Sequence, residues 1–101
     1  MFVKIYSYKI KKKYLPKWKN IQRSAKTIYR KHGDPVKWTY LLDRKEEFVT
    51  IIEISSYLSK KDFLKIKKEV DNDKEIGKLF NKFLEIVYKN KIVEKGFILK
   101  I

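Results

Sequence analysis

The chain contains no cysteine, a single histidine and only three glycines among its 101 residues. The lack of cysteine excludes disulfides, thiolate metal sites and a thiol nucleophile. One histidine cannot supply a histidine-rich metal centre within one chain. No P-loop, nucleotide-binding glycine pattern or serine nucleophile elbow is present either. We therefore expect no metal site and no bound cofactor.

Long apolar runs are also missing. No stretch approaches the ~20 apolar residues of a membrane span, and Lys4 interrupts the N-terminus where a signal peptide needs apolar residues. We therefore expect a cytoplasmic protein with no membrane partner. The hydrophobic content of 44% and the aromatic content of 15% predict a folded chain. Its length suits one domain, residues 1–101, built from a sheet and a layer of helices.

Acidic residues are scarce in the first half of the chain. Residues 1–45 carry a net charge of +12, whereas residues 46–101 carry only +2. Such asymmetry favours an anionic partner such as nucleic acid. However, only three of the 26 basic residues are arginine, the residue that phosphate- and base-reading interfaces prefer. A lysine-rich surface of this kind also fits a thermophile or an AT-rich genome, so both interpretations stay open.

Hydrophobic periodicity predicts the element order β-α-β-β-α-β. The first helix, 16–32, has Pro16 in its first turn and is stopped by Gly33. A second helix follows Ser59 as N-cap, is interrupted at residues 71–73, and ends near Asn90. The predicted strands are residues 2–10, 36–42, 48–57 and 92–101, and a short polar turn at residues 43–47 joins the middle two as a hairpin.

This order is that of a ferredoxin-like α+β fold, in which two helices cover one face of a four-stranded antiparallel sheet. The strands are nevertheless apolar on both parities, as residues 48–57 and 2–10 show. Covering one face would leave an apolar patch of the size that usually marks an interface. Because closed two-fold dimers are the commonest oligomers, we expect a homodimer formed through the open sheet faces.

The second half of the chain resembles a known superfamily. The pattern from Tyr57 through Ser59, Asp62, Phe63 and Val70, and the run DNDKEIGKLFNKFLEIV at residues 71–87, are similar to the dimeric α+β barrel superfamily, and within it to NIPSNAP-like and antibiotic-biosynthesis-monooxygenase-like proteins. Asp73 precedes a lysine where that family often has proline. The resemblance implies the fold and dimerisation. It says little of function, because the fold hosts monooxygenases, haem-degrading enzymes, isomerases and ligand-sensing domains.

Aromatic residues of the strands are the first set of candidate site residues. In cofactor-independent monooxygenases of this superfamily, such residues hold an electron-rich aromatic substrate that reacts with oxygen after deprotonation. We therefore expect a pocket for a small aromatic or apolar molecule on the open sheet face, with phenol and indole donors orienting the ligand. The alternative is that these side chains form the core of an interface. The set comprises Tyr6, Tyr8, Trp38, Tyr40 and Tyr57.

His32 and Glu53 are the two candidates for proton transfer. His32 is the only histidine, and it is either a base or a cation that stabilises the end of its helix. Haem degradation is disfavoured, because the resemblance places the ligand histidine in the second helix, which has none. Glu53 stands among apolar strand residues, so it reaches solvent at an exposed edge, meets a lysine, or occupies a pocket with a raised pKa.

A basic stripe on the first helix carries the alternative function. Four cations recur at helical spacing with no acidic residue between them, away from the apolar stripe that faces the core. They would contact phosphates without reading sequence. An RNA-recognition module shares the element order, but its third-strand motif of a basic residue, glycine and alternating aromatics is absent. The stripe consists of Lys19, Arg23, Lys26 and Arg30.

Overall fold

The computed structural model describes residues 1–43 and 47–100, and in it the predicted order of elements is confirmed. The second helix of the prediction consists of two helices, and two short 3-10 turns, η1 and η2, flank the helical segments. The elements are β1 (Phe2–Lys11), η1 (Lys12–Tyr14), α1 (Leu15–His32), β2 (Val36–Asp43), β3 (Phe48–Tyr57), α2 (Lys60–Asp71), α3 (Lys74–Ile86), η2 (Tyr88–Asn90) and β4 (Val93–Ile98).

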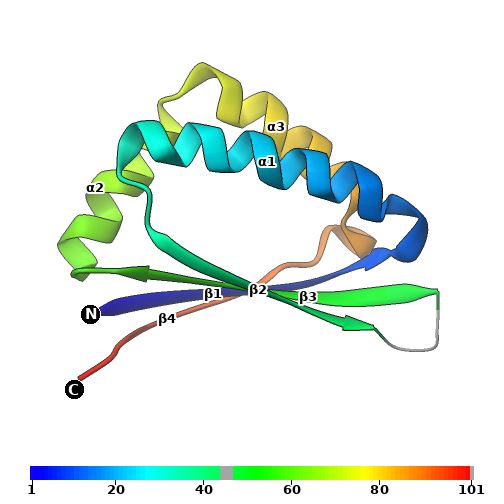
Figure 1. Ribbon diagram of the computed structural model, residues 1–101, viewed down its shortest axis with the longest axis horizontal. Coiled ribbons are helices and arrows are strands. Elements are labelled where there is room, and N and C mark those ends of the chain that lie inside the picture. Colours follow the sequence, from blue (N-terminus) through cyan, green and yellow to red (C-terminus); the bar gives the residue numbers. More distant parts are fainter. Residues whose placement is uncertain (44–46, 101) are drawn as a thin grey trace.

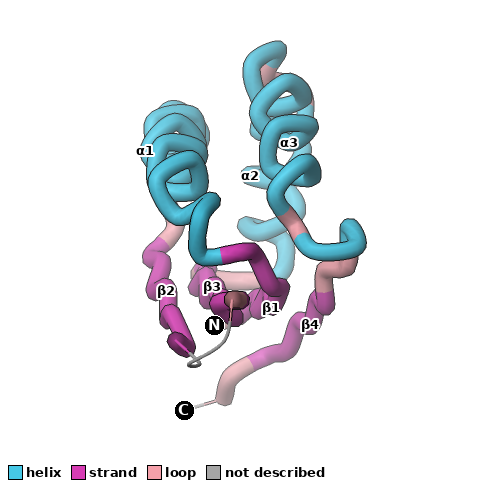
Figure 2. The backbone as a smooth tube through the Cα atoms, turned by 90° about the vertical axis from the view of Figure 1, so that its right-hand side faces the viewer, coloured by secondary structure: helices cyan, strands magenta, loops and turns pink. Residues whose placement is uncertain are grey.

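The four strands form one antiparallel sheet in the order β2-β3-β1-β4. All three helices lie on one side of it (Figure 1). Figure 2 shows α1 above the β2 side of the sheet and α3 above the β4 side. This is the predicted ferredoxin-like α+β architecture. No helix among the described residues combines the length and the hydrophobicity that crossing a membrane requires.

The predicted helix signals act as expected. Pro16 stands in the first turn of α1, and Gly33 ends that helix with a φ of 136°, where a side chain would be strained. The Ser59 hydroxyl accepts the backbone N–H of Asp62 at 3.1 Å and caps α2. At the predicted break, Asp73 caps α3 by accepting the backbone N–H of Glu75 at 3.0 Å.

Several element ends differ from the prediction, among them the end of β2, which extends to Asp43. β1 extends to Lys11, which pairs with Phe48, and α1 begins one residue earlier, at Leu15. β4 is shorter than residues 92–101, although the backbone N–H of Leu99 still donates to Met1 at 2.8 Å. The middle of the predicted hairpin turn, residues 44–46, and residue 101 lie outside the described residues.

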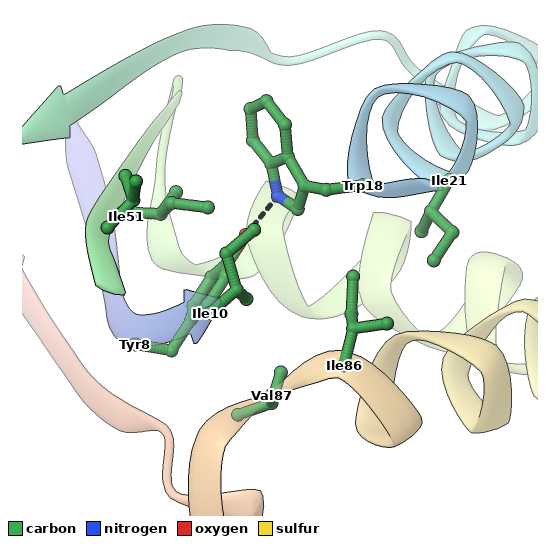
Figure 3. Packing of buried hydrophobic residues seen from close by; sticks show 8 residues of the cluster. Tyr8, Ile10, Trp18, Ile21, Ile51, Ile86 and Val87 are labelled. Carbon is green, nitrogen blue, oxygen red and sulfur yellow. Dashed lines mark hydrogen bonds between the residues drawn. The ribbon is translucent and has the colours of Figure 1, made fainter. Parts of the chain in front are cut away.

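The register divides the sheet into an inner face toward the helices and an open face. On the inner face, Tyr8 and Ile10 of β1 join Val49 and Ile51 of β3 in a buried cluster with side chains of α1 and α3. Figure 3 shows this packing, with Trp18 of α1 above Tyr8. A second buried cluster lies toward α2 and comprises Phe2, Ile28, Tyr57, Phe63, Ile66 and Val70.

The alternate residues of each strand point to the open face, which is largely apolar. On its edge strand β2, Val36, Trp38, Tyr40 and Leu42 are 59, 48, 53 and 46% exposed. Their partners across the β2–β3 pair include Ile54 and Ile52. The charged strand residues of the described part of this face are lysines toward its ends or edge: Lys9, Lys11 and Lys95.

Candidate functional site

A cavity of about 610 Å³ lies between the inner face of the sheet and the helices. It is bordered by residues of both buried clusters. Its floor comes from the strands, and its roof comes from α1, α2 and α3. The walls are mainly aromatic and aliphatic side chains. Polar groups come from the central part of the sheet and from the side of the cavity near α2 and β4. A concave, mostly apolar space with a few polar groups is the usual form of a small-molecule site.

Glu53 is a carboxylate on the floor of this cavity. It stands on β3 directly opposite Tyr6 of β1 and Thr39 of β2. Burial raises the pKa of Glu53 above the ordinary carboxyl value, because desolvation disfavours the charged form. The positive charge of Lys37 and hydrogen bonding to Tyr8 and Gln22 oppose that rise without cancelling it. Glu53 therefore holds its proton to higher pH than an exposed glutamate.

Lys37 faces Glu53 from the neighbouring strand. Part of Lys37 is exposed because β2 is an edge strand, but its Nζ lies 3.5 Å from the centre of the Tyr29 ring. Burial lowers the pKa of Lys37, and the charges of Glu53 and Asp34 oppose this shift. The pKa values of the two groups therefore move toward each other. Glu53 holds its proton more strongly than an exposed glutamate, and Lys37 holds its proton less strongly than an exposed lysine.

Tyrosine hydroxyls supply further polar groups. The indole Nε1 of Trp18 donates to the Tyr8 hydroxyl at 2.8 Å (Figure 3). Burial raises the pKa of Tyr8, and the charge of Glu53 raises it further. Burial likewise raises the pKa of Tyr6, Tyr29 and Tyr57. All four phenols therefore remain protonated at neutral pH and can donate hydrogen bonds to a ligand.

Charged pairs stand where the cavity meets β4 and α2. Lys67 Nζ donates to Asp71 at 2.7 Å, and this interaction raises the pKa of Lys67. Lys4 forms an ion pair with Glu94, which lies opposite Tyr6. Lys67, Asp71 and Glu94 all border the cavity. This side is therefore polar, whereas the roof under α1 and α3 is mainly apolar.

The predicted pocket residues separate between the two faces. Tyr6, Tyr8 and Tyr57 line the cavity together. Trp38 borders it, but the register places the side chains of Trp38 and Tyr40 on the open face with Ile54 and Ile52. The cavity therefore lies on the side of the sheet opposite to the predicted open-face pocket. The tyrosines share the parity of Val49 and Ile51, which pack under the helices.

His32 does not border the cavity. Its Nε2 lies 3.1 Å from Asp73, and its Nδ1 lies 3.9 Å from Glu69. The histidine thus joins the end of α1 to α2 and to the break between α2 and α3. Its position fits the structural alternative, a group that stabilises a helix end. Among the described residues, no cluster of histidine and carboxylate side chains has the arrangement of a metal site.

The basic stripe lies on the solvent side of α1. All four of its side chains are exposed. Among the described residues, none of the four takes part in an ion pair within 4.0 Å. The stripe is therefore separate from both the cavity and the open face of the sheet.

Sequence reasoning missed Lys37, Tyr29 and Gln22. Tyr29 belongs to the apolar stripe of α1 and was not distinguished from its core neighbours. Lys37 alternates with the apolar residues of β2, which is the pattern of a solvated lysine. The signal that identifies it is the hairpin pairing: Lys37 lies opposite Ser55, on the parity of Glu53.

Comparison of the whole fold with solved structures finds similar ones. A NIPSNAP family protein of unknown function from Agrobacterium tumefaciens shares 17% identity, with a TM-score of 0.73 over 96% of this chain and 86% of that chain. An uncharacterised NIPSNAP domain protein from Burkholderia xenovorans shares 10%, with a TM-score of 0.71 over 99% and 95%. SnoaB, a cofactor-independent oxygenase from Streptomyces nogalater, shares 8%, with a TM-score of 0.62 over 99% and 94%.

By sequence, no family model and no curated protein matches the chain. The structural likenesses confirm the predicted ferredoxin-like α+β fold. Identities of 8–17% show the fold alone, and the same fold supports unrelated chemistries.

Proposed function

We propose that the chain binds a small aromatic or largely apolar molecule in the cavity and that Glu53 takes a proton from it. The observation that carries this proposal is a carboxylate of raised pKa on the floor of an aromatic-walled space, facing a lysine. A base whose pKa approaches the working pH is more effective in proton transfer than an ordinary carboxylate. The phenols of Tyr6, Tyr8 and Tyr57 would orient the polar group of the ligand.

The anion formed by that proton transfer is electron-rich. Lys37 would stabilise its negative charge from across the cavity. Direct reaction of such an anion with dioxygen needs no cofactor, and SnoaB, which has the same fold, is described as a cofactor-independent oxygenase. We therefore propose oxygenation of a carbon acid as the reaction class, with dioxygen as the oxidant.

The test uses 2-tetralone, a bicyclic aromatic ketone with an acidic C–H beside its carbonyl. In deuterated buffer, NMR follows the loss of that proton signal in the presence of the protein. We expect exchange to fall about 100-fold or more in Glu53→Gln, the lower end of what a positioned base contributes. The matched control is Glu85→Gln on the outer side of α3, where the carboxylate pairs with Lys17. Equal exchange rates in both variants would overturn the proposal.

We also propose that two copies of the chain pack through their open sheet faces. The support is the row of half-exposed apolar side chains on β2, together with Val93 and Phe97 on β4. A continuous apolar face of this kind is typical of an interface between subunits. Its lysines lie toward the ends or edge of the face, where an interface is ordinarily polar.

The exposed stripe on α1 supports a second, separate proposal of binding to nucleic acid. Its outer residues, Lys19 and Arg30, are eleven positions apart, which is roughly 16 Å along a helix. Four cations over that length match several phosphates of one strand. Such contacts would be independent of base sequence, and their affinity would fall steeply with salt.

A further inference from the structure

We propose that Lys37 captures the carbonyl group of an aromatic aldehyde or ketone as an imine, inside the same cavity. This inference rests on the binding part of the proposed function and adds a substrate class to it.

The Lys37 amine lies where a ligand in the cavity would meet it. Lys37 borders the cavity from the edge strand β2, and its Nζ lies over the Tyr29 ring at 3.5 Å. The charged and titratable groups that face it are Glu53, Asp34 and Tyr29. Both carboxylates and the aromatic ring favour the ammonium form. Burial nevertheless dominates and lowers the pKa of Lys37, which enlarges the fraction of neutral amine.

Imine formation needs an acid as well as an amine, and Glu53 fits that role. The neutral amine attacks the carbonyl carbon, a C–N bond forms, and the carbonyl oxygen takes a proton to give a carbinolamine. Loss of that hydroxyl group as water then leaves the C=N bond. Glu53, whose pKa is raised by burial, can hold the proton that this loss of water requires. The sequence consumes one carbonyl compound and releases one water, and no electrons are transferred.

Lys67 provides a contrast within the same cavity. It also borders the space, but its Nζ donates to Asp71 at 2.7 Å. That pairing raises the pKa of Lys67, so its amine is almost wholly protonated at neutral pH. Two lysines thus border one ligand space with pKa shifts in opposite directions, and the lysine whose pKa is lowered faces Glu53.

The experiment uses 2-naphthaldehyde with cyanoborohydride at neutral pH, followed by peptide mass spectrometry. The aldehyde has no C–H beside its carbonyl, so labelling does not depend on the proton abstraction assigned to Glu53. Cyanoborohydride supplies the hydride that turns the imine into a stable secondary amine. We expect Lys37 to be the first lysine modified, ahead of Lys67, and 2-tetralone to slow the modification.

Lys37→Arg should lose this adduct while keeping the positive charge, and Lys17→Arg on the surface should retain it. Binding of 2-tetralone, measured by NMR line broadening, checks that the K37R cavity is intact. Label spread over surface lysines, with Lys37 no faster than Lys67, would overturn the inference. If tetralone exchange still depends on Glu53 in that case, the proposed function stands. If Lys37 is labelled but exchange does not depend on Glu53, the inference stands and the base role of Glu53 fails.

Discussion

The two faces of the sheet differ in chemistry, although both contain many apolar residues. The inner face holds the charged residues Lys4, Lys37, Glu53 and Glu94 beside three tyrosines that line the cavity. The open face holds a half-exposed apolar row, with lysines only toward its ends or edge. This difference underlies two separate proposals, ligand binding at the inner face and association through the open face.

Neighbouring isoleucines of β3 give the largest expected effect. Ile51 points inward and is 0% exposed, whereas Ile52 points to the open face. We expect Ile51→Ala to lower the free energy of unfolding by about 2–5 kcal/mol, the range for a fully buried isoleucine. Ile52→Ala should cost less in a monomer. Urea denaturation of both variants at low protein concentration compares them, and equal losses would contradict the division of the faces.

The open face is tested by adding charge to β2. Trp38→Lys with Tyr40→Lys should convert the proposed dimer to a monomer, because two added charges would have to be buried without partners when the apolar faces associate. Sedimentation velocity at micromolar concentration measures the change. Tetralone exchange should persist in the monomer if the cavity is complete within one chain. A wild-type chain that is monomeric under these conditions would disprove the dimer.

Glu53→Gln should raise the melting temperature at neutral pH. The folded pKa of Glu53 lies above its unfolded value, so the folded state binds the proton to higher pH. The free energy of unfolding therefore falls as the pH rises from the unfolded to the folded pKa of Glu53. Above the folded pKa, the ionised carboxylate destabilises the folded state. Below the ordinary carboxyl pKa both states are protonated, and the advantage of glutamine should vanish. Melting curves by circular dichroism at neutral and acid pH test this, with Glu85→Gln as the control.

A lower melting temperature of Glu53→Gln at neutral pH would contradict this prediction. It would mean that the attraction between Glu53 and Lys37 outweighs the cost of burying the carboxylate. In that case the pKa of Lys37 would be raised rather than lowered, because the same attraction favours the charged form of both groups.

The α1 stripe offers the smallest expected effect on stability. Arg23→Glu with Lys26→Glu lies on neither sheet face, so the free energy of unfolding should change by no more than about 0.5 kcal/mol for each exposed site. Tetralone exchange and dimerisation should not change. Binding to single-stranded oligonucleotides, followed by fluorescence anisotropy across a salt series, should weaken and lose salt dependence. Unchanged binding would exclude the stripe as the site.

Most of the fold was readable from sequence because its signals are local. The cap at Ser59, the stop at Gly33 and the break at Asp73 each depend on one residue and its neighbours. The site depends on register and on which strand parity the helices cover. A strand that is apolar on both sides, such as β3, does not specify which side the helices cover, so the sequence did not predict the cavity on the inner face. Glu53 was identified because a carboxylate among isoleucines is costly in either orientation.

The two tryptophans of the chain stand on opposite faces of the sheet. Trp18 is buried and bonded to Tyr8 beside the cavity, whereas Trp38 is half-exposed on the open face. The intrinsic fluorescence of the protein therefore contains two reporters in different surroundings. Quenching or a spectral shift of Trp18 follows occupancy of the cavity, and the emission of Trp38 follows dilution of the proposed dimer. With Trp38→Phe and Trp18→Phe, each signal can be observed alone without an added dye.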